Sequence, residues 1–159
     1  MLFFCQIDSY KTKHSPGWVI MSIYNPHSVL LLAERLGVSP EDLLISCRFC
    51  CWFMTFEDLM HFDWKGLQLI WRNGNVFGCC RGCSRIVAYE EHQQFCTHEL
   101  LGADLIDLVK VPLHLIFIRC VQCLKQLSFA EKLDIIARND KFCCIRGAWR
   151  GRCRVCAPR

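Results

Sequence analysis

The chain has 159 residues, a length that suits one ordinary domain or two small ones sharing a core. Because 53% of the residues are hydrophobic and 21% are charged, most of the chain is expected to fold, and a long disordered tail is excluded. The formal net charge of +4 is uneven, since residues 119–159 carry ten Lys/Arg and three Asp/Glu, and this basic end favours an anionic partner. No apolar run approaches the roughly 20 residues of a membrane-spanning helix, so no membrane association is expected.

The N-terminal part is expected to contain a loose extension followed by short helices. Residues 1–20 lack a clear hydrophobic period, and they also lack the basic start of a secretory signal, so the cysteines are expected to be reduced. Ser28 can cap a helix over residues 29–36 that ends at the following glycine. Ser39 and the proline after it can start a second short helix, with residues 43–45 as its apolar face.

The rest of the chain shows helix and strand signals in a recurring order. A helix is expected over residues 56–64, then a strand over 67–71 and a hairpin turn at Asn73-Gly74. Residues 84–109 have helical character and are expected to connect two small units, leaving a cleft because neither unit has enough core to bury its inner face. The C-terminal part is predicted to contain a helix over 129–138, a turn at 139–140 and a strand over 142–145.

The most informative feature is the spacing of the 14 cysteines. Eight of them form four C-x-x-C pairs: Cys47 and Cys50, Cys80 and Cys83, Cys120 and Cys123, Cys153 and Cys156. The first two pairs are separated by 29 residues, the last two pairs are again separated by 29, and the two sets are offset by 73 positions. This match indicates an internal duplication with one tetrahedral Cys₄ site in each copy.

The same offset relates residues other than cysteine. Thr55 to Asp58 fall on Ser128 to Glu131, so both copies can start a helix with a hydroxyl cap and an acid three residues later. The fold class is therefore predicted as α+β, with two duplicated small zinc-binding modules joined by a connector helix. The expected organisation is an extension (1–20), a helical segment (21–46), a first module (47–83), a connector helix and linker (84–119), a second module (120–156) and a tail (157–159).

Two C-x-x-C turns supply the four thiolates that a structural Zn²⁺ prefers, so two structural zinc ions per chain are expected. Ordinary buried thiols, disulfides and an iron–sulfur cluster are the alternatives, although cluster cysteines are usually bunched more closely. The other six cysteines have no partner at ligand spacing and are expected to be small buried or half-buried hydrophobes: Cys5, Cys51, Cys79, Cys96, Cys143 and Cys144. No histidine pair has metal-binding spacing and no catalytic constellation can be placed, so an enzyme is not expected.

The full cysteine pattern resembles that of the papillomavirus early protein six family, the viral transforming proteins, over residues from about 21 to 159. Supporting motifs are Glu41 to Ile45 before the first pair, Trp71-Arg72 and Val76 to Cys80 before the second, Ile118 to Cys120 at the third, and Ile145 to Gly147 with Trp149 and Gly151 to Cys153 at the fourth. The match from about Met21 suggests that the natural start lies there.

The resemblance implies a host-directed adaptor without catalytic activity, located in the host nucleus and cytoplasm. Members of this family hold an acidic helical L-x-x-L-L peptide of a cellular protein between the two modules and the connector helix. Residues carried over by position to the apolar part of that pocket are Phe49, Leu67, Ile70, Val87 and Phe117, and those carried over to its basic rim are Arg72, Arg119 and Arg146.

Two differences from the sequence pattern of this family limit the partners that are expected. Ala148 stands where well-studied transforming members have an arginine that pairs with the peptide's acids. The chain ends in Ala-Pro-Arg, without the carboxyl-terminal motif that some members use for PDZ domains, so no PDZ partner is expected. These features look like a cutaneous-type member, whose partner would be a mastermind-like Notch coactivator instead of the ubiquitin-protein ligase used by mucosal types. Weak self-association is a further expectation.

A rival class is a zinc-finger transcription regulator that binds nucleic acid. The run of Arg150, Arg152 and Arg154 could form a nonspecific electrostatic patch for phosphates, and a plain solvated surface is the alternative reading of the same residues. A zinc-dependent enzyme would require an open coordination position.

Overall fold

The computed structural model describes residues 25–158, so the expectations for residues 1–20 lie outside the described part of the chain. The fold divides into two compact units. Unit 1 contains the described residues up to Asp63 together with Gln68–Cys79, and unit 2 contains Trp64–Leu67 and the chain from Cys80 onward. Within the described residues, none of the helices is long and apolar enough to cross a membrane.

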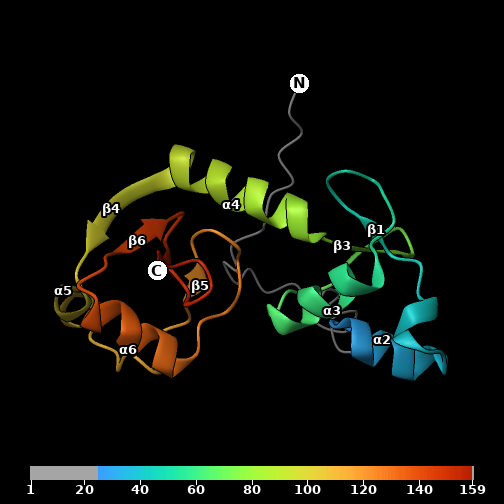
Figure 1. Ribbon diagram of the computed structural model, residues 1–159, viewed down its shortest axis with the longest axis horizontal. Helices are drawn as coiled ribbons and strands as arrows, with labels where there is room; N and C mark the ends of the chain where they lie inside the picture. The colour runs from blue at the N-terminus through green and yellow to red at the C-terminus, as the bar shows by residue number, and fades with distance from the viewer. Residues whose placement is uncertain (1–24, 159) are drawn as a thin grey trace. The chain divides into compact units, whose positions relative to one another are not determined.

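Unit 1 combines helices with a small sheet, whose elements are labelled in Figure 1. Its helices are α2 (Val29–Leu36), the 3₁₀ turn η1 (Pro40–Asp42) and α3 (Phe56–Trp64), the last residue of which falls in unit 2. Its strands are β1 (Ser46–Cys47), β2 (Ile70–Arg72) and β3 (Asn75–Gly78). The central strand β3 pairs parallel with β1 and antiparallel with β2, and the two turn residues between β2 and β3 both have positive φ, as expected for Asn-Gly.

Helix α2 is stabilised at both ends as its sequence predicts. The Ser28 hydroxyl accepts a hydrogen bond from the Leu31 backbone N–H, and Gly37 ends the helix in the left-handed conformation. The Asp63 carboxylate, at the end of α3, accepts hydrogen bonds from the backbone N–H groups of Val29 (2.8 Å) and Leu30 (2.9 Å). The negative charge therefore satisfies free N–H groups at the positive end of the helix dipole and ties α2 to α3.

The second short helix is limited to the single turn η1, and the expected apolar face over residues 43–45 is wrong. Leu43 has extended backbone angles, and the Ile45 carbonyl accepts a hydrogen bond from the Met54 N–H. Leu43 and Ile45 are buried whereas Leu44 is 76% exposed, which is the alternation of an extended chain. The three apolar residues fit a strand-like period of two as well as they fit a helix, and the pairing with residue 54 decides between them.

Unit 2 has helices α4 (Arg81–Phe95), α5 (Gly102–Val109) and α6 (Phe129–Ala137), and strands β4 (Cys96–Leu100), β5 (Arg119–Cys120), β6 (Phe142–Ile145) and β7 (Ala148–Gly151). The strands form one sheet in the order β4-β6-β7-β5, with only β5 and β7 parallel. All four residues of β6 are buried, so side chains on both faces of this strand are covered. Its ends agree with the predicted strand over 142–145.

The segment after the second C-x-x-C pair contains more than helix. In Figure 1, α4 is a long helix that runs directly into β4, and α5 follows that strand. The sequence predicts the helical character of both helices but not the strand between them, which pairs with β6 in the sheet of unit 2.

The two copies share their backbone pairing as well as their cysteines. Cys47 pairs with Gly78 in parallel strands, and Cys120 pairs with Gly151 in the same way, 73 positions later in each case. The Cys47 N–H donates to the Trp52 carbonyl, and the equivalent N–H of Cys120 donates to the Lys125 carbonyl. The loop residues Cys51 and Leu124 both have positive φ, 63° and 64°. The internal duplication predicted from spacing therefore extends to individual hydrogen bonds and turns.

Candidate metal centres and peptide-binding residues

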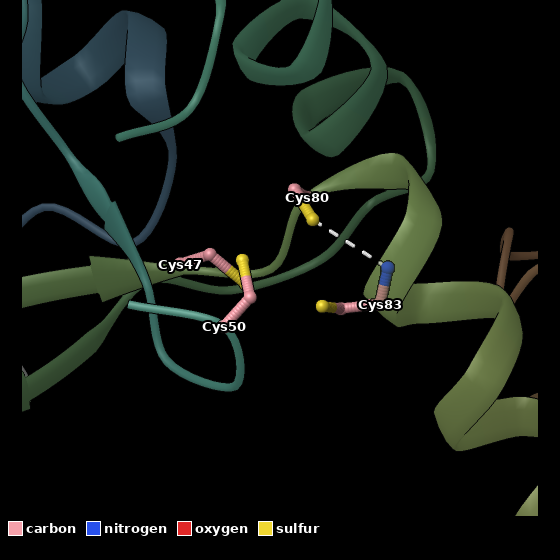
Figure 2. Close-up of side chains that lie close together, drawn as sticks. All are labelled: Cys47, Cys50, Cys80 and Cys83. Carbon is pink, nitrogen blue, oxygen red and sulfur yellow. Dashed lines mark hydrogen bonds between the residues drawn. The ribbon is translucent and has the colours of Figure 1, made fainter. Parts of the chain in front are cut away.

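The first cysteine cluster brings Cys47, Cys50, Cys80 and Cys83 together, with all four Sγ atoms within 4.8 Å of one another. Figure 2 shows their side chains converging from the C-x-x-C turn of Cys47 and Cys50, called the first knuckle here, and from the start of α4; the turn of Cys120 and Cys123 is the second knuckle. Cys80 is the N-cap of α4, and its Sγ accepts a hydrogen bond from the Cys83 N–H at 3.5 Å. An N–H donor and the positive end of the helix dipole both favour a thiolate at this position.

The second cluster has the same construction from Cys120, Cys123, Cys153 and Cys156. The Sγ of Cys120 accepts hydrogen bonds from the N–H groups of Gln122 (3.4 Å) and Cys153 (3.5 Å). The sulfurs of Cys123 and Cys153 lie 3.8 Å apart. Four sulfurs placed about 2.3 Å from the centre of a tetrahedron are separated by about 3.8 Å, so this spacing fits a ZnS₄ centre.

The thiols of the second cluster cannot all ionise in the absence of a cation. Hydrogen bonds from Cys123 and Cys153 lower the pKa of Cys120, whereas hydrogen bonding to Cys120 and burial raise the pKa of Cys123. Burial and the neighbouring thiolates raise the pKa of Cys156 to about 12. A divalent cation removes this conflict because it stabilises four thiolates at once. Both clusters therefore fit one structural Zn²⁺ each, as predicted from sequence, and four protein ligands leave no coordination position for a substrate.

The eight residues predicted to bind a peptide belong to both units. Phe49, Ile70 and Arg72 lie in unit 1, where Phe49 and Ile70 are half-buried and Arg72 is exposed at the end of β2. The other five lie in unit 2: Leu67, Val87, Phe117, Arg119 and Arg146. Leu67 and Val87 are half-buried, and Phe117 is 55% exposed. Their role in peptide binding stays a prediction.

Within unit 2, three of these residues lie close together. The Arg119 guanidinium donates hydrogen bonds to the carbonyls of Lys65 (3.2 Å) and Gly66 (2.8 Å), the two residues before Leu67, and to that of Leu124 (2.9 Å). Its Cζ also lies 5.0 Å from the centre of the Phe117 ring. Burial, and then the positive charge of Arg150, lower the pKa of Arg119. Arg119 is therefore a positioned cation beside an exposed aromatic ring, whereas sequence reasoning treated it as a rim charge.

Arg146 has a different environment. It lies in the turn between β6 and β7 with φ 52°, and its guanidinium lies 3.7 Å from the centre of the Phe95 ring at the end of α4. The residue is exposed. Stacking on the ring limits the orientations of the side chain while the charge remains accessible.

Comparison with known proteins gives a family for the chain. The family model described as Early Protein (E6) matches residues 47–156. Protein E6 of human papillomavirus 38 is 43% identical over 137 residues, covering 86% of this chain and 97% of that protein. Protein E6 of human papillomavirus 23 is 42% identical over 139 residues, covering 87% and 88%. The chain belongs to the E6 early protein family.

This finding confirms the family resemblance inferred from the cysteine spacing, and the relatives come from cutaneous-type viruses, as the departures in sequence predict. Among solved structures, the C-terminal zinc-binding domain of the E6 oncoprotein of human papillomavirus 51 is similar at 30% identity, with a TM-score of 0.35, over 37% of this chain and 78% of that chain.

The arginine run of this E6 chain does not form a uniform basic stripe. Arg150 is buried, and one of its guanidinium nitrogens lies 3.6 Å from a carboxylate oxygen of Glu91. Arg154 is exposed but paired with Asp134, an interaction that raises the pKa of Arg154 and lowers that of the acid. Two of the three charges are thus paired with acids within the unit, which leaves less charge for a phosphate backbone.

The structure also contains two buried lysines that sequence reasoning missed. The Lys132 ammonium donates to the carbonyls of Leu113, His114 and Ile116, and burial lowers its pKa. The Lys65 ammonium donates to the buried Ser84 hydroxyl at 2.6 Å. Lysines in amphipathic sequence look like surface charges, and no local signal marks these two as structural.

The cysteines outside the two clusters are partly as expected. Cys143 and Cys144 are buried, and Cys79 and Cys96 are half-buried. Cys51 is exposed, so the expectation of burial is wrong there, although Leu124 at the equivalent position of the second copy is buried. Cys5 lies outside the described residues.

Proposed function

We propose that this chain is a non-catalytic viral adaptor that binds acidic helical L-x-x-L-L motifs of host proteins. The leucines of such a motif would contact the apolar side chains of Phe49, Leu67, Ile70, Val87 and Phe117, and its carboxylates would lie near Arg72, Arg119 and Arg146. This mode of recognition uses leucines at helical spacing for affinity and charge pairing for orientation.

The observation that carries the proposal is the environment of Arg119. Three backbone carbonyls hold its guanidinium in place, and the exposed ring of Phe117 lies against it. The hydrogen bonds to residues 65 and 66 also position the segment that presents Leu67. An exposed aromatic ring, a fixed cation and a half-buried leucine are thus adjacent, which suits a ligand that is apolar and acidic at the same time.

The remaining residues add apolar surface and positive charge. Val87 is half-buried on α4, and Ile70 is half-buried on β2, where it pairs with Phe77. The exposed Arg72 and Arg146 supply positive charge, which attracts an acidic peptide at long range and is screened by salt.

Host partners, cellular location and biological consequence rest on family membership. A ubiquitin-protein ligase or a mastermind-like Notch coactivator is the proposed partner, and redirection of host ubiquitination, transcription, apoptosis and differentiation is the proposed outcome, in the host nucleus and cytoplasm. Binding of nucleic acid as a transcription regulator is less favoured, because Arg150 and Arg154 are paired with Glu91 and Asp134.

Calorimetry with the full, zinc-loaded chain and an acidic L-x-x-L-L peptide tests the proposal. Leu67→Glu should abolish binding, because it places an unpaired charge against apolar leucines. Leu108→Glu is the matched control, since Leu108 is 60% exposed on α5, and it should bind as wild type does. Because Leu67 is half-buried, Phe117→Ser at an exposed position provides a second variant that should weaken binding without unfolding.

A folded Leu67→Glu chain that binds the peptide as well as wild type does would overturn this assignment. So would a wild-type chain that does not bind the acidic peptide but binds duplex DNA with a steep dependence on salt and discrimination between bases. The second result would support the rival class.

A further inference from the structure

A third group of metal-ligating side chains lies in unit 2, outside both Cys₄ clusters. One ligand atom each from His92, Cys96 and Cys143 lies within 4.8 Å of the other two. We refer to this group as the His-Cys-Cys cluster. The positions 73 residues earlier are Val19, Ile23 and Ile70, none of which ligates metals, so the cluster belongs to one copy of the duplication and not to the zinc pattern of the family.

The backbone places the two ligands of α4 and β4 with defined geometry. His92 and Cys96 are four residues apart at the end of α4, and the Cys96 N–H donates to the His92 carbonyl. This is the hydrogen bond of an α-helix, in which side chains four residues apart lie on the same face. A helix end of this kind holds an imidazole and a thiol side by side.

A strand irregularity brings the third ligand to the same place. Cys143 lies in the middle of β6, opposite Glu99 of β4, and the register between the two strands shifts between Cys96 and His98. As a result Cys96 pairs with Ile145, which is two residues from Cys143 and therefore on the same face of β6. Without the shift, Cys96 would point to the opposite face.

The charges around the cluster favour a cation. The C-terminal end of α4 carries the negative end of the helix dipole, which stabilises a cation placed there. The acid Glu99 pairs with Cys143 across the two strands, and its carboxylate also lies 3.5 Å from the Lys141 ammonium. Arg150 also pairs with Cys143, on its other side, but its guanidinium lies 3.6 Å from a Glu91 carboxylate oxygen, so its charge is compensated.

We propose that His92, Cys96 and Cys143 form a third metal site that binds a thiophilic divalent cation such as Zn²⁺ with three protein ligands and solvent at the fourth position. One imidazole nitrogen and two thiolates match the ligand preference of zinc. Binding converts two thiols to thiolates and releases two protons, with no change in oxidation state. With fewer protein ligands than a Cys₄ cluster, this ion exchanges faster and is removed first by a chelator.

The experiment measures zinc per chain by equilibrium dialysis of the full, reduced protein against Zn²⁺, followed by elemental analysis. The wild-type chain should bind three ions, one for each group of ligands. His92→Asn and Cys143→Ser should each bind two. Cys51→Ser is the matched control, since Cys51 is an exposed cysteine outside all three groups, and it should retain three.

His92→Asn keeps the test decisive if the buried Cys143→Ser variant fails to fold, because His92 is half-buried and lies at a helix end. Co²⁺ absorption provides a second measurement, as the wild-type spectrum should contain a component with mixed nitrogen and sulfur ligation that His92→Asn lacks. A mild chelator should remove the third ion while circular dichroism stays unchanged.

Binding of two ions by the wild-type chain would overturn the proposal, and so would binding of three by His92→Asn. A Cys96–Cys143 disulfide in the purified protein under the same reducing conditions, detected as a loss of two hydrogen masses in the linked peptide, would also overturn it.

Discussion

The Lys125 ammonium lies 2.9 Å from both carboxylate oxygens of Glu131, in a pair that is largely buried. The same carboxylate accepts a hydrogen bond from the Ser128 N–H, and the Ser128 hydroxyl accepts one from the Glu131 N–H, which completes a capping box at the start of α6. Lys125 also lies 4.5 Å from the centre of the Trp64 ring. The Lys125–Glu131 pair thus joins the loop that carries Cys120 and Cys123, the start of α6 and the last residue of α3.

This arrangement makes the stability of unit 2 dependent on pH. Burial alone would raise the pKa of Glu131, but the hydrogen bonds from Lys125 and Ser128 outweigh it and lower the pKa. A carboxyl whose pKa is lowered on folding stabilises the fold fully above its unfolded pKa of about 4.3, and this contribution is lost as the pH falls through the folded value. Stability should therefore decrease on acidification below about pH 5.

Glu131→Gln tests this dependence by urea unfolding of the zinc-loaded chain. At neutral pH the variant should lose about 3 kcal/mol, because the Lys125 ammonium is left without its counter-ion. The difference from wild type should shrink as the pH falls, which separates this effect from protonation of zinc ligands, common to both proteins. Glu34→Gln, on the exposed face of α2, is the control and should change stability by less than about 0.5 kcal/mol. A pH-independent difference would contradict the assignment.

The two zinc centres should be separately removable by mutation. Cys47→Ser should eliminate one ion and unfold the first knuckle, and Cys120→Ser should do the same for the second. Zinc binding at such sites supplies on the order of 10 kcal/mol to folding, more than a small module gains from its core. Elemental analysis together with amide hydrogen exchange would locate each loss. A fold that persists after all zinc has been removed by a strong chelator would be the contrary result.

Replacing each of two helical glycines by alanine should change stability in opposite directions, because one glycine is tightly packed and the other is not. A Cβ on Gly102, the first residue of α5, would collide with the Ile136 side chain on α6, so Gly102→Ala should cost about 1–3 kcal/mol. A Cβ on Gly82, in the first turn of α4, would meet nothing within 4 Å, so Gly82→Ala should stabilise by about 0.4–1 kcal/mol. Thermal unfolding of both variants, with zinc present, checks the opposite signs. Equal effects would show that α5 does not pack on α6 this closely.

Sequence predicts the parts of this fold that local signals control. Helix α3 and strand β6 have the predicted ends, and the zinc ligands follow from spacing alone, because a C-x-x-C turn creates its own geometry. Strand β4 was not predicted, since its polar sequence has no alternation and its partner β6 lies more than 40 residues away. The His-Cys-Cys cluster depends on the same long-range pairing, so no local pattern marks it.

The environments of the candidate peptide-binding residues also could not be predicted from sequence. Sequence and family resemblance identify Arg119 as a positive charge, but they do not indicate that three carbonyls hold it. Removing this side chain therefore disturbs the segment before Leu67 as well as the charge. The exposed Arg72 is better suited to measure electrostatic attraction alone, whereas Arg146 also stacks on the Phe95 ring.

Positive charge at the predicted peptide site should contribute to binding through exposed ion pairs. Arg72→Ala should weaken binding of an acidic L-x-x-L-L peptide about two- to five-fold, because an exposed ion pair contributes about 0.5–1 kcal/mol, and it should reduce the dependence of affinity on salt. Arg119→Ala should weaken binding further and also lower the unfolding temperature, since the carbonyls of Lys65, Gly66 and Leu124 lose their donor.

Calorimetry at two salt concentrations provides the measurement, with Arg35→Ala as the control because Arg35 is an exposed arginine on α2 outside the predicted site. The control removes the same charge, so any effect of net charge alone should appear equally in Arg35→Ala and Arg72→Ala. If the two variants lose affinity to the same extent, the attraction is a property of the whole chain. If only Arg72→Ala loses affinity and salt dependence, the carboxylates of the peptide lie near that arginine.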